Sequence, residues 1–243
     1  MTALPGFPPS AGTPAASPAD ERRVRMAARA AGRHGLAHAY GHCSLRLDAV
    51  HFLVCAPQPM GLIEPGEHGT VVSVHAPLPG TVLGEVRLHQ QIYARRPDVR
   101  GIVRSMPPSV MALGTARRTP RPRHGMGAYF GAGARLWDDP QLVRDDERAA
   151  QVAEALDDAN AIVMRGNGAV VAAASLEKAL CLTWYLEDAA RIELQLLGAG
   201  LADSGAILSP AECKARATDA GGIFERMWQY LTAHDPEAAH AGS

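Results

Sequence analysis

The sequence is short of several residues that mark particular protein classes. Lysine occurs only as Lys178 and Lys214, aromatic residues make up 5% of the 243 residues, and the formal net charge is −1. No apolar run approaches the length of a membrane span. We therefore expect no nucleic-acid partner and no membrane partner, because neither electrostatic footprint is visible. A Schiff-base lysine is not expected either, since Lys178 lies in the polar segment SLEKAL.

Cysteine is also scarce. The four cysteines, Cys43, Cys55, Cys181 and Cys213, form no Cys-x-x-Cys motif. A chain of this length buries a core without disulfides, so we expect reduced and mostly buried thiols. The first 20 residues have neither the basic nor the apolar segment of a secretory signal. The cytoplasm is the expected compartment by default.

The remaining composition predicts a single folded body. Hydrophobic residues make up 47% and charged residues 20%, which favours a sizeable core. We expect one α/β domain over residues 20–233, after a disordered lead (1–19) and before a disordered tail (234–243). Asp20 and Ser175 are the expected N-caps of the first and the longest helix. Periodicity predicts strands within 41–47, 51–57, 69–77, 99–106 and the hairpin 161–174, and helices within 21–35, 84–97, 108–116, 145–160, 175–200 and 209–234.

Three segments in this order carry a family resemblance. They are GLAHAYGHCSLRL (35–47), GEVRLHQQIYARRPDVRGIVRSMPP (84–108) and AIVMRGNGAVVAAASLEKALCLTWYLEDAARIELQ (161–195). Together the segments resemble the class II aldolase/adducin family. The resemblance implies a three-layer α/β/α domain with a central, mostly antiparallel mixed sheet. It also implies a ring homotetramer with active sites at subunit interfaces.

The resemblance puts unusual residues at the family's metal site. Family enzymes usually hold zinc with three histidines, two from His-x-His before Pro-Pro and one from an Arg-x-His-Gly hairpin. The corresponding residues here are Arg104, Met106 and Asn167. A guanidinium repels a cation, a thioether suits softer metals, and a neutral amide oxygen is a weak ligand. We therefore expect no metal and no cofactor, because a zinc site needs three or four better donors.

The resemblance keeps the family's catalytic carboxylate at Glu85, and His89 follows on the same helix face. Arg104 would bring a permanent positive charge to the former metal position, in a fork suited to a carboxylate or an enolate. Tyr129 is a further candidate proton donor. We expect Glu85, Arg104, His89 and Tyr129 to be catalytic in a metal-independent carbon–carbon lyase or decarboxylase. The structural alternatives are an ion pair for Arg104, packing for His89 and helix-dipole complementarity for Glu85.

The substrate-binding segments differ from those of the sugar-phosphate aldolases. The hydroxyl-rich phosphate loops of those enzymes are replaced by CAPQP (55–59) and LGE (83–85). The segment GAYFGAGARLWDDPQLV (127–143) looks more like the family's decarboxylase-type branch. The expected substrate is a small, non-phosphorylated hydroxy/keto or aromatic carboxylate. Its expected contacts are His42, Ser44, Met106, His124 and Asn167.

Three alternatives stay open. The chain could be a non-catalytic, adducin-like assembly protein. It could also be a repurposed cyclase or dehydratase of a specialised pathway. A different metal site could form if the fold brought His42, His89 and His124 together. Met106 could simply fill the core, and Asn167 could serve the turn between two glycines.

Overall fold

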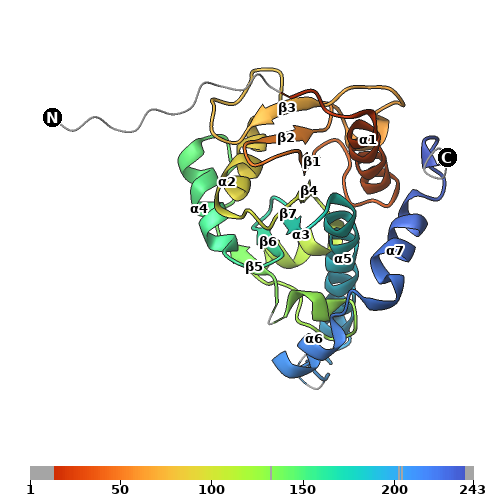
Figure 1. The fold of residues 1–243 in the computed structure, drawn as a ribbon. Helices are drawn as coiled ribbons and strands as arrows, with labels where there is room; N and C mark the ends of the chain where they lie inside the picture. The colour runs from red at the N-terminus through yellow and green to blue at the C-terminus, as the bar shows by residue number, and fades with distance from the viewer. Residues whose placement is uncertain (1–13, 132, 202, 204, 239–243) are drawn as a thin grey trace.

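The computed structural model describes residues 14–131, 133–201, 203 and 205–238 (Figure 1). Most of the predicted lead and the end of the predicted tail therefore lie outside the described residues. A seven-stranded sheet has the order β3-β2-β1-β4-β7-β6-β5. All neighbouring strands are antiparallel except the parallel pair β5–β6, which confirms a mostly antiparallel mixed sheet. The strands are β1 (His42–Arg46), β2 (His51–Val54), β3 (Thr70–Ser73), β4 (Gly101–Ser105), β5 (Arg135–Trp137), β6 (Ala161–Met164) and β7 (Ala169–Ala173).

Helices cover both faces of the sheet. Helices α2 and α4 pack together on one face, while α1, α3 and α5 cover the other, and α7 packs outside α5 (Figure 1). This arrangement confirms the predicted three layers. The α-helices are α1 (Pro18–Arg33), α2 (Arg87–Arg95), α3 (Pro108–Thr115), α4 (Asp146–Leu156), α5 (Leu176–Gly198), α6 (Pro210–Arg216) and α7 (Ile223–Thr232). Short 3-10 helices are η1 (Met60–Leu62), η2 (Gly84–Val86), η3 (Gly127–Phe130) and η4 (Ala220–Gly222).

The central strands are buried on both faces, which explains their nearly continuous apolar sequences. Successive side chains of a strand point to opposite faces. In β4, Val103 joins the core under α1 and α5, whereas Ile102 joins the core under α2 and α4. In β1 the same alternation sends Cys43 and Leu45 toward α1. The polar residues of β1 are left on the α2 face, which prepares the site described below.

The helix starts test the predicted caps. Ser175 caps α5 as predicted, because its side chain accepts a hydrogen bond from the Lys178 N–H. The prediction for α1 was wrong. Ser17 is the N-cap, its Oγ accepts from the Asp20 N–H, and Pro18 takes the first helical position, which suits the fixed φ of proline. Helix α1 therefore begins inside the predicted lead.

The C-terminal boundary also needs correction, because residues 234–238 pack against α1. Arg29 Nη2 lies 2.6 Å from Asp235 Oδ1, and Arg25 Nη2 lies 2.7 Å from Glu237 Oε1. The prediction of a disordered tail was based on composition. It did not account for arginines spaced four residues apart on a helix, which offer neighbouring donors to two carboxylates.

The four cysteines are free and buried, as expected. In the part of the chain that the structure describes, no helix is both long enough and apolar enough to cross a membrane.

Candidate functional site

Four polar segments meet at one end of the central strands of the sheet. Strand β1 begins there, β4 ends there, the β6–β7 turn lies beside them, and η2 approaches from the start of α2. His42 and Arg104 are paired across β1 and β4, so their side chains are neighbours on the α2 face. A cavity of about 530 Å³ opens at this point, a size typical of small-molecule sites. Five of the residues singled out in the sequence line it: His42, Glu85, Arg104, Met106 and Asn167.

Arg104 is a buried cation in the wall of this cavity. Its side chain is 2% exposed, and its Nη2 lies 2.9 Å from Glu85 Oε2 and donates to Asn167 Oδ1 at 2.8 Å. Burial lowers the pKa of Arg104, and the Glu85 carboxylate opposes that change. Among the described residues, no partner is found for Arg104 Nε, Arg104 Nη1 or Asn167 Nδ2. These buried donors would bind an anion or a carbonyl oxygen, because unpaired buried donors are costly.

The β6–β7 turn is held against the end of β4 by glycine. Gly168 has a φ of +78°, and a Cβ there would collide with the carbonyl oxygen of Ser105. The turn therefore approaches β4 closely, and Asn167 reaches Arg104. Asn167 is not one of the described non-glycine residues with positive φ, so the left-handed conformation belongs to the flanking glycines.

The donor set does not suit zinc. Arg104, Met106 and Asn167 face the same cavity, but the first is cationic and the amide oxygen of the third is already bonded to Arg104. Within the described ranges, no group of three or more His, Cys, Asp or Glu side chains is placed to hold a metal ion. A zinc ion would gain too few N, S or carboxylate ligands here and would meet a buried positive charge.

His89 and Ser44 do not contact the cavity. His89 is 0% exposed and lies behind His42, with its Nε2 2.8 Å from His42 Nδ1. Its Nδ1 lies 2.6 Å from Ser44 Oγ, which in turn lies 2.9 Å from the Tyr93 hydroxyl. Ser44, predicted to bind the substrate, and His89, predicted to be catalytic, are therefore not among the residues that line this cavity. Both side chains extend along the α2 face of the sheet, which the sequence spacing could not locate.

Burial keeps both imidazoles uncharged. Burial, followed by the charge of Arg104, lowers the pKa of His89 to about 3. The pKa of His42 lies well below its usual range, first through burial and then through His89 and Arg104. Both rings are therefore neutral at neutral pH, so each ring carries a single N–H.

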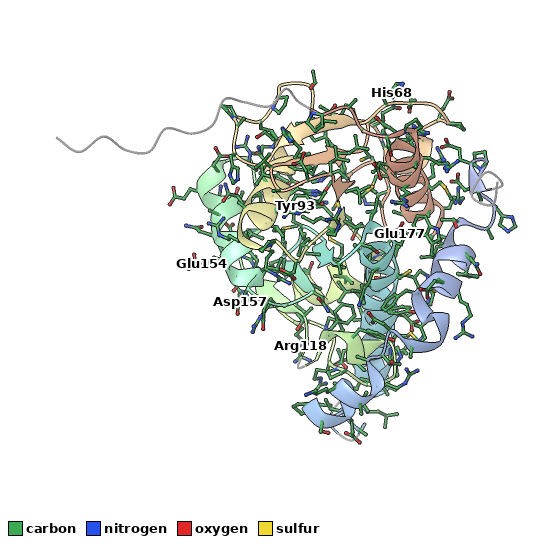
Figure 2. The ribbon with its side chains drawn as sticks, viewed as in Figure 1. His68, Tyr93, Arg118, Glu154, Asp157 and Glu177 are labelled. Carbon is green, nitrogen blue, oxygen red and sulfur yellow. The ribbon has the colours of Figure 1, made fainter. Side chains whose placement is uncertain are left out.

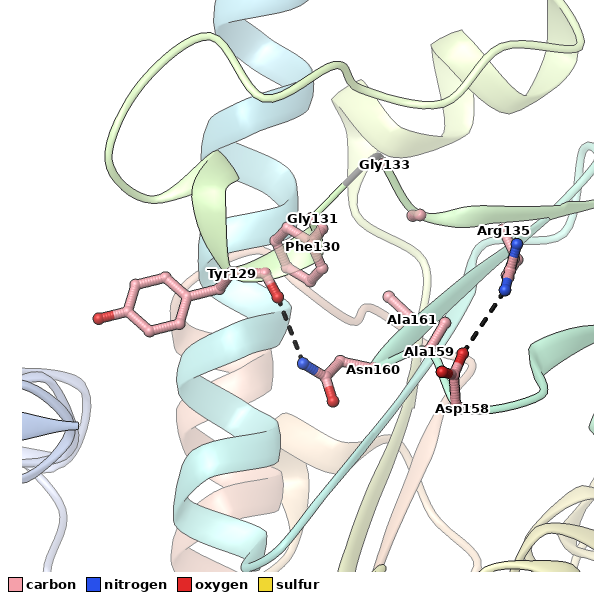
Figure 3. A pocket seen from close by; sticks show the side chains of 10 residues that line it. Tyr129, Phe130, Gly131, Gly133, Arg135, Asp158, Ala159, Asn160 and Ala161 are labelled. Carbon is pink, nitrogen blue, oxygen red and sulfur yellow. Dashed lines mark hydrogen bonds and ion pairs between the residues drawn. The ribbon is translucent and has the colours of Figure 1, made fainter. Parts of the chain in front are cut away.

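Tyr129 and His124 are not among the residues that line the cavity of Glu85 and Arg104. The Tyr129 hydroxyl donates to the Thr218 carbonyl at 2.7 Å, and the residue lines a separate cavity of about 280 Å³ (Figure 3). His124 Nε2 lies 3.8 Å from Asp188 Oδ2. The expectation that both residues join Glu85 was wrong for a single chain. The alternative metal site of His42, His89 and His124 is not formed either, because His124 lies beside α5.

The sequence reasoning missed Arg144. This exposed residue lines the cavity from the segment that precedes α4. That segment is fastened to η2 and α2: the Val143 N–H donates to Glu85 Oε1 at 3.4 Å, and Arg87 Nη1 donates to the Arg144 carbonyl at 2.6 Å. The local sequence gave no signal for this contact. Tyr40, Leu83 and Leu142 add an exposed apolar rim.

Comparison with known proteins agrees with this fold. The model of the class II aldolase and adducin N-terminal domain matches residues 22–194. The chain is 30% identical over 237 residues to 3,4-dihydroxyphthalate decarboxylase of Terrabacter sp. (strain DBF63), covering 88% of this chain and 96% of that protein. The enzyme of the same name from Arthrobacter keyseri is 29% identical over 234 residues, covering 85% and 90%.

Solved structures show the same architecture. L-fuculose 1-phosphate aldolase from Glaciozyma antarctica PI12 has a TM-score of 0.72 at 19% identity, covering 87% of this chain and 88% of that one. The aldolase II superfamily protein from Pseudomonas syringae has a TM-score of 0.73 at 20% identity, covering 90% and 93%. The decarboxylase relatives support an enzyme of lyase type. The chain belongs to the class II aldolase and adducin N-terminal domain family.

Proposed function

We propose that this protein is a metal-independent decarboxylase of a small, non-phosphorylated aromatic hydroxy carboxylate, with 3,4-dihydroxyphthalate or a close analogue as its substrate. One observation carries the proposal: a buried guanidinium, whose Nε and Nη1 have no partner among the described residues, faces the cavity beside a carboxylate. The likeness to decarboxylases over nearly the whole chain supports the reaction type.

The chemistry of such an acid sets what the site must do. In 3,4-dihydroxyphthalate one ring hydroxyl stands beside a carboxylate. If the ring carbon that bears the carboxylate takes a proton and the hydroxyl loses one, the ring becomes a β-keto acid. Loss of CO2 then leaves the bonding electron pair on the ring oxygen. Overall, the acid takes up one proton and releases CO2.

Arg104 stabilises the ring oxygen as this negative charge develops. A fixed, desolvated cation lowers the activation barrier most where negative charge develops in the transition state. The Asn167 amide supplies a second donor through Nδ2, because its oxygen is held by Arg104. The Glu85 carboxylate takes up a proton from water and passes it to the ring carbon, since it lies at the cavity and is partly exposed.

Arg144 binds the carboxylate that is not lost. Arg144 lines the cavity from the exposed segment before α4. Two arginines and one carboxylate give the cavity a net positive charge, which favours a dicarboxylate over a neutral sugar.

A bound metal is not needed in this proposal, because Arg104 supplies the positive charge at short range. Two differences from a metal site follow. A guanidinium does not lower the pKa of a bound water molecule, so hydrolytic chemistry is not expected. Chelators would not remove the charge.

We also propose that the chain assembles as the tetramer expected for the family. Tyr40, Leu83 and Leu142 are exposed apolar side chains at the mouth of the cavity, and such rims often mark interfaces. A neighbouring copy would then complete the cavity wall. Light scattering of the purified protein gives the molar mass that tests this assembly.

Activity on three compounds tests the proposed function. Purified protein is incubated with 3,4-dihydroxyphthalate, with phthalate, which lacks the hydroxyls, and with L-fuculose 1-phosphate. We expect CO2 release from the first compound alone. CO2 release that is equally fast with phthalate, or cleavage of the sugar phosphate, would contradict the proposal.

A further inference from the structure

A hydrogen-bonded chain leads away from the cavity into the protein. His42 and Ser44 are alternate residues of β1, so they share the face that α2 covers. His89 and Tyr93 lie four residues apart on α2 and face that strand. Tyr93 lies deep among the side chains between α2 and the sheet (Figure 2), and it is 2% exposed. The contacts follow one another: His42 contacts His89, His89 contacts Ser44, and Ser44 contacts Tyr93.

The far end of this chain fixes its direction. The Tyr93 hydroxyl donates to the Ser44 carbonyl at 3.2 Å, and a carbonyl can only accept. The single proton of Tyr93 is thereby used. The 2.9 Å contact between Ser44 Oγ and the Tyr93 hydroxyl is then a hydrogen bond only if Ser44 is the donor.

The same reasoning continues to the cavity. Because Ser44 has given its proton to Tyr93, the 2.6 Å contact with His89 Nδ1 requires that Nδ1 carry the hydrogen. The neutral His89 ring then has a bare Nε2, so the 2.8 Å contact requires a hydrogen on His42 Nδ1. The neutral His42 ring is left with a bare Nε2. Only this assignment makes all four contacts hydrogen bonds.

His42 Nε2 is buried and has no partner among the described residues, and His42 lines the cavity. We propose that His42 Nε2 is the base that accepts the proton of the substrate hydroxyl, and that His89, Ser44 and Tyr93 are positioning residues that hold His42 in the Nδ1–H tautomer. The identity of the hydroxyl rests on the proposed function, whereas the tautomer does not.

The proton transfers balance. The substrate O–H bond breaks and its proton forms a bond with His42 Nε2, while the Glu85 carboxylate takes a proton from water and passes it to the ring carbon. The bond between the ring carbon and the carboxylate carbon then breaks, CO2 leaves, and the electron pair passes to the ring oxygen. His42 returns its proton to that oxygen, and Glu85 is again a carboxylate. No oxidant or reductant is required.

The chain stabilises His42 during this exchange. When Nε2 is protonated, the Nδ1–H bond to His89 becomes a bond from a cation and gains strength. Arg104 is the neighbouring cation that opposes this charge, and the Glu85 carboxylate beside Arg104 reduces that effect. A His42 ring without the His89 contact would be free to present an N–H to the cavity.

Histidine nitrogen NMR tests the tautomers without any substrate. The protein is labelled with ¹⁵N-histidine, and the signals of His42 and His89 are identified from their loss in His42→Asn and His89→Asn. We expect a protonated Nδ1 and a bare Nε2 in both rings. Protonated Nε2 atoms would overturn the proposal, even in an active enzyme.

Tyr93→Phe tests the positioning role, with Tyr185→Phe as the matched control. Tyr185 is another buried tyrosine, which packs on α5 against Tyr129 and Phe224. Without the Tyr93 hydroxyl, Ser44 can turn its proton to His89, so both rings gain Nε2–H character. We expect kcat to fall about tenfold or more with KM unchanged, and the control to keep both the kcat and the NMR signals of the wild type. Unchanged tautomers in Tyr93→Phe would overturn the role of Tyr93.

His42→Asn tests the base itself, and we expect kcat to fall about 10²- to 10⁴-fold. Wild-type activity in this variant would overturn the proposal. Should the wild-type protein release no CO2 from 3,4-dihydroxyphthalate, the proposed function fails, and the NMR experiment still decides the direction of the chain.

Discussion

Arg104 at the end of β4 and Glu85 in η2 form an ion pair in which Nη2 and Oε2 are 2.9 Å apart and the arginine side chain is 2% exposed. Burying a guanidinium is costly unless it is paired and fully hydrogen-bonded. Glu85 and Asn167 both bind the same nitrogen, Nη2, and the other two nitrogens have no partner in the described structure. The hydrogen-bonding groups of Arg104 are therefore only partly satisfied, as expected of a cation that binds a ligand rather than one that stabilises the fold.

The first prediction concerns Arg104. Arg104→Met keeps an unbranched stem but removes the charge and all donors. We expect kcat/KM for CO2 release to fall about 10²- to 10³-fold, the usual effect of losing one oxyanion-stabilising group. Arg104→Lys restores the charge without the fork and is expected to recover only part of the activity. The assay is CO2 release, with circular dichroism to confirm folding.

A matched experiment separates chemistry from structure at this pair. Arg104→Met leaves Glu85 without its buried partner, so some loss of stability is expected. The double variant Arg104→Met/Glu85→Gln removes that unpaired charge. It should regain stability in urea unfolding but not activity. Recovery of activity together with stability would show that neither Arg104 nor Glu85 acts in the reaction and that the two form only a structural ion pair.

The second prediction concerns Arg144, which lines the cavity from the segment before α4. Arg144→Gln is expected to raise KM for 3,4-dihydroxyphthalate about tenfold, with a smaller effect on kcat, because the contact forms in both the ground and the transition state. The same variant should not change KM for a monocarboxylate analogue. Arg135→Gln, at an exposed position of β5, is the control. Equal KM values for wild type and Arg144→Gln would show that Arg144 does not bind the substrate.

The sequence predicted that residues of two separate motifs lie close together, while their roles in binding and catalysis stay predictions. Arg104, Met106 and Asn167 came from two separate motifs, and the structure places them around one cavity with Glu85. Short motifs succeed here because β4 and the β6–β7 hairpin are neighbours in the sheet. Ser44 and His89 lie behind the residues that line this cavity, and a motif does not say whether a side chain lies in the wall of a cavity or behind it.

The third prediction concerns pH. The pKa of His89 is lowered to about 3 by burial and by Arg104, so the unfolded chain binds more protons below about pH 6.5. Stability is therefore complete above that pH and is lost as the pH falls, by about 1.4 kcal/mol per pH unit for this ring. Urea unfolding from about pH 7 to about pH 5 measures the slope. His89→Gln should have a shallower slope, and equal slopes would contradict a buried, neutral His89.

The fourth prediction concerns the C-terminal contact. Burial alone would raise the pKa of Asp235, but hydrogen bonds from Arg29, the Glu237 N–H and Arg33 outweigh it, and the pKa is lowered. That stabilisation is present above about pH 4 and is lost as the pH falls through the folded value. Asp235→Asn should cost about 3 kcal/mol at neutral pH, because it breaks a buried pair.

Asp219→Asn is the matched control for that variant, since Asp219 pairs with Lys178 at an exposed site. Its expected cost is below about 1 kcal/mol. Equal effects of the two substitutions, measured by urea unfolding, would show that residues 234–238 contribute little to the stability of the fold.

Other residues could not be placed from the sequence, for definable reasons. Tyr129 and His124 belong to a glycine-rich segment whose path is set by packing against α5 and α7, not by its own periodicity. Arg144 reaches the cavity only because its segment is fastened to Glu85 and Arg87, which precede it by more than 50 residues. Asp20 lost the N-cap role to Ser17, because the Ser-Pro pair starts the helix three residues earlier.

In the proposed function, a fixed guanidinium does the electrostatic work of a bound metal ion. The most direct measurement is CO2 release from 3,4-dihydroxyphthalate by protein whose metal content is determined before and after exhaustive chelation. The account predicts far less than one divalent ion per chain and an unchanged rate after chelation. A stoichiometric divalent ion whose removal abolishes the rate, and whose return restores it, would contradict the account.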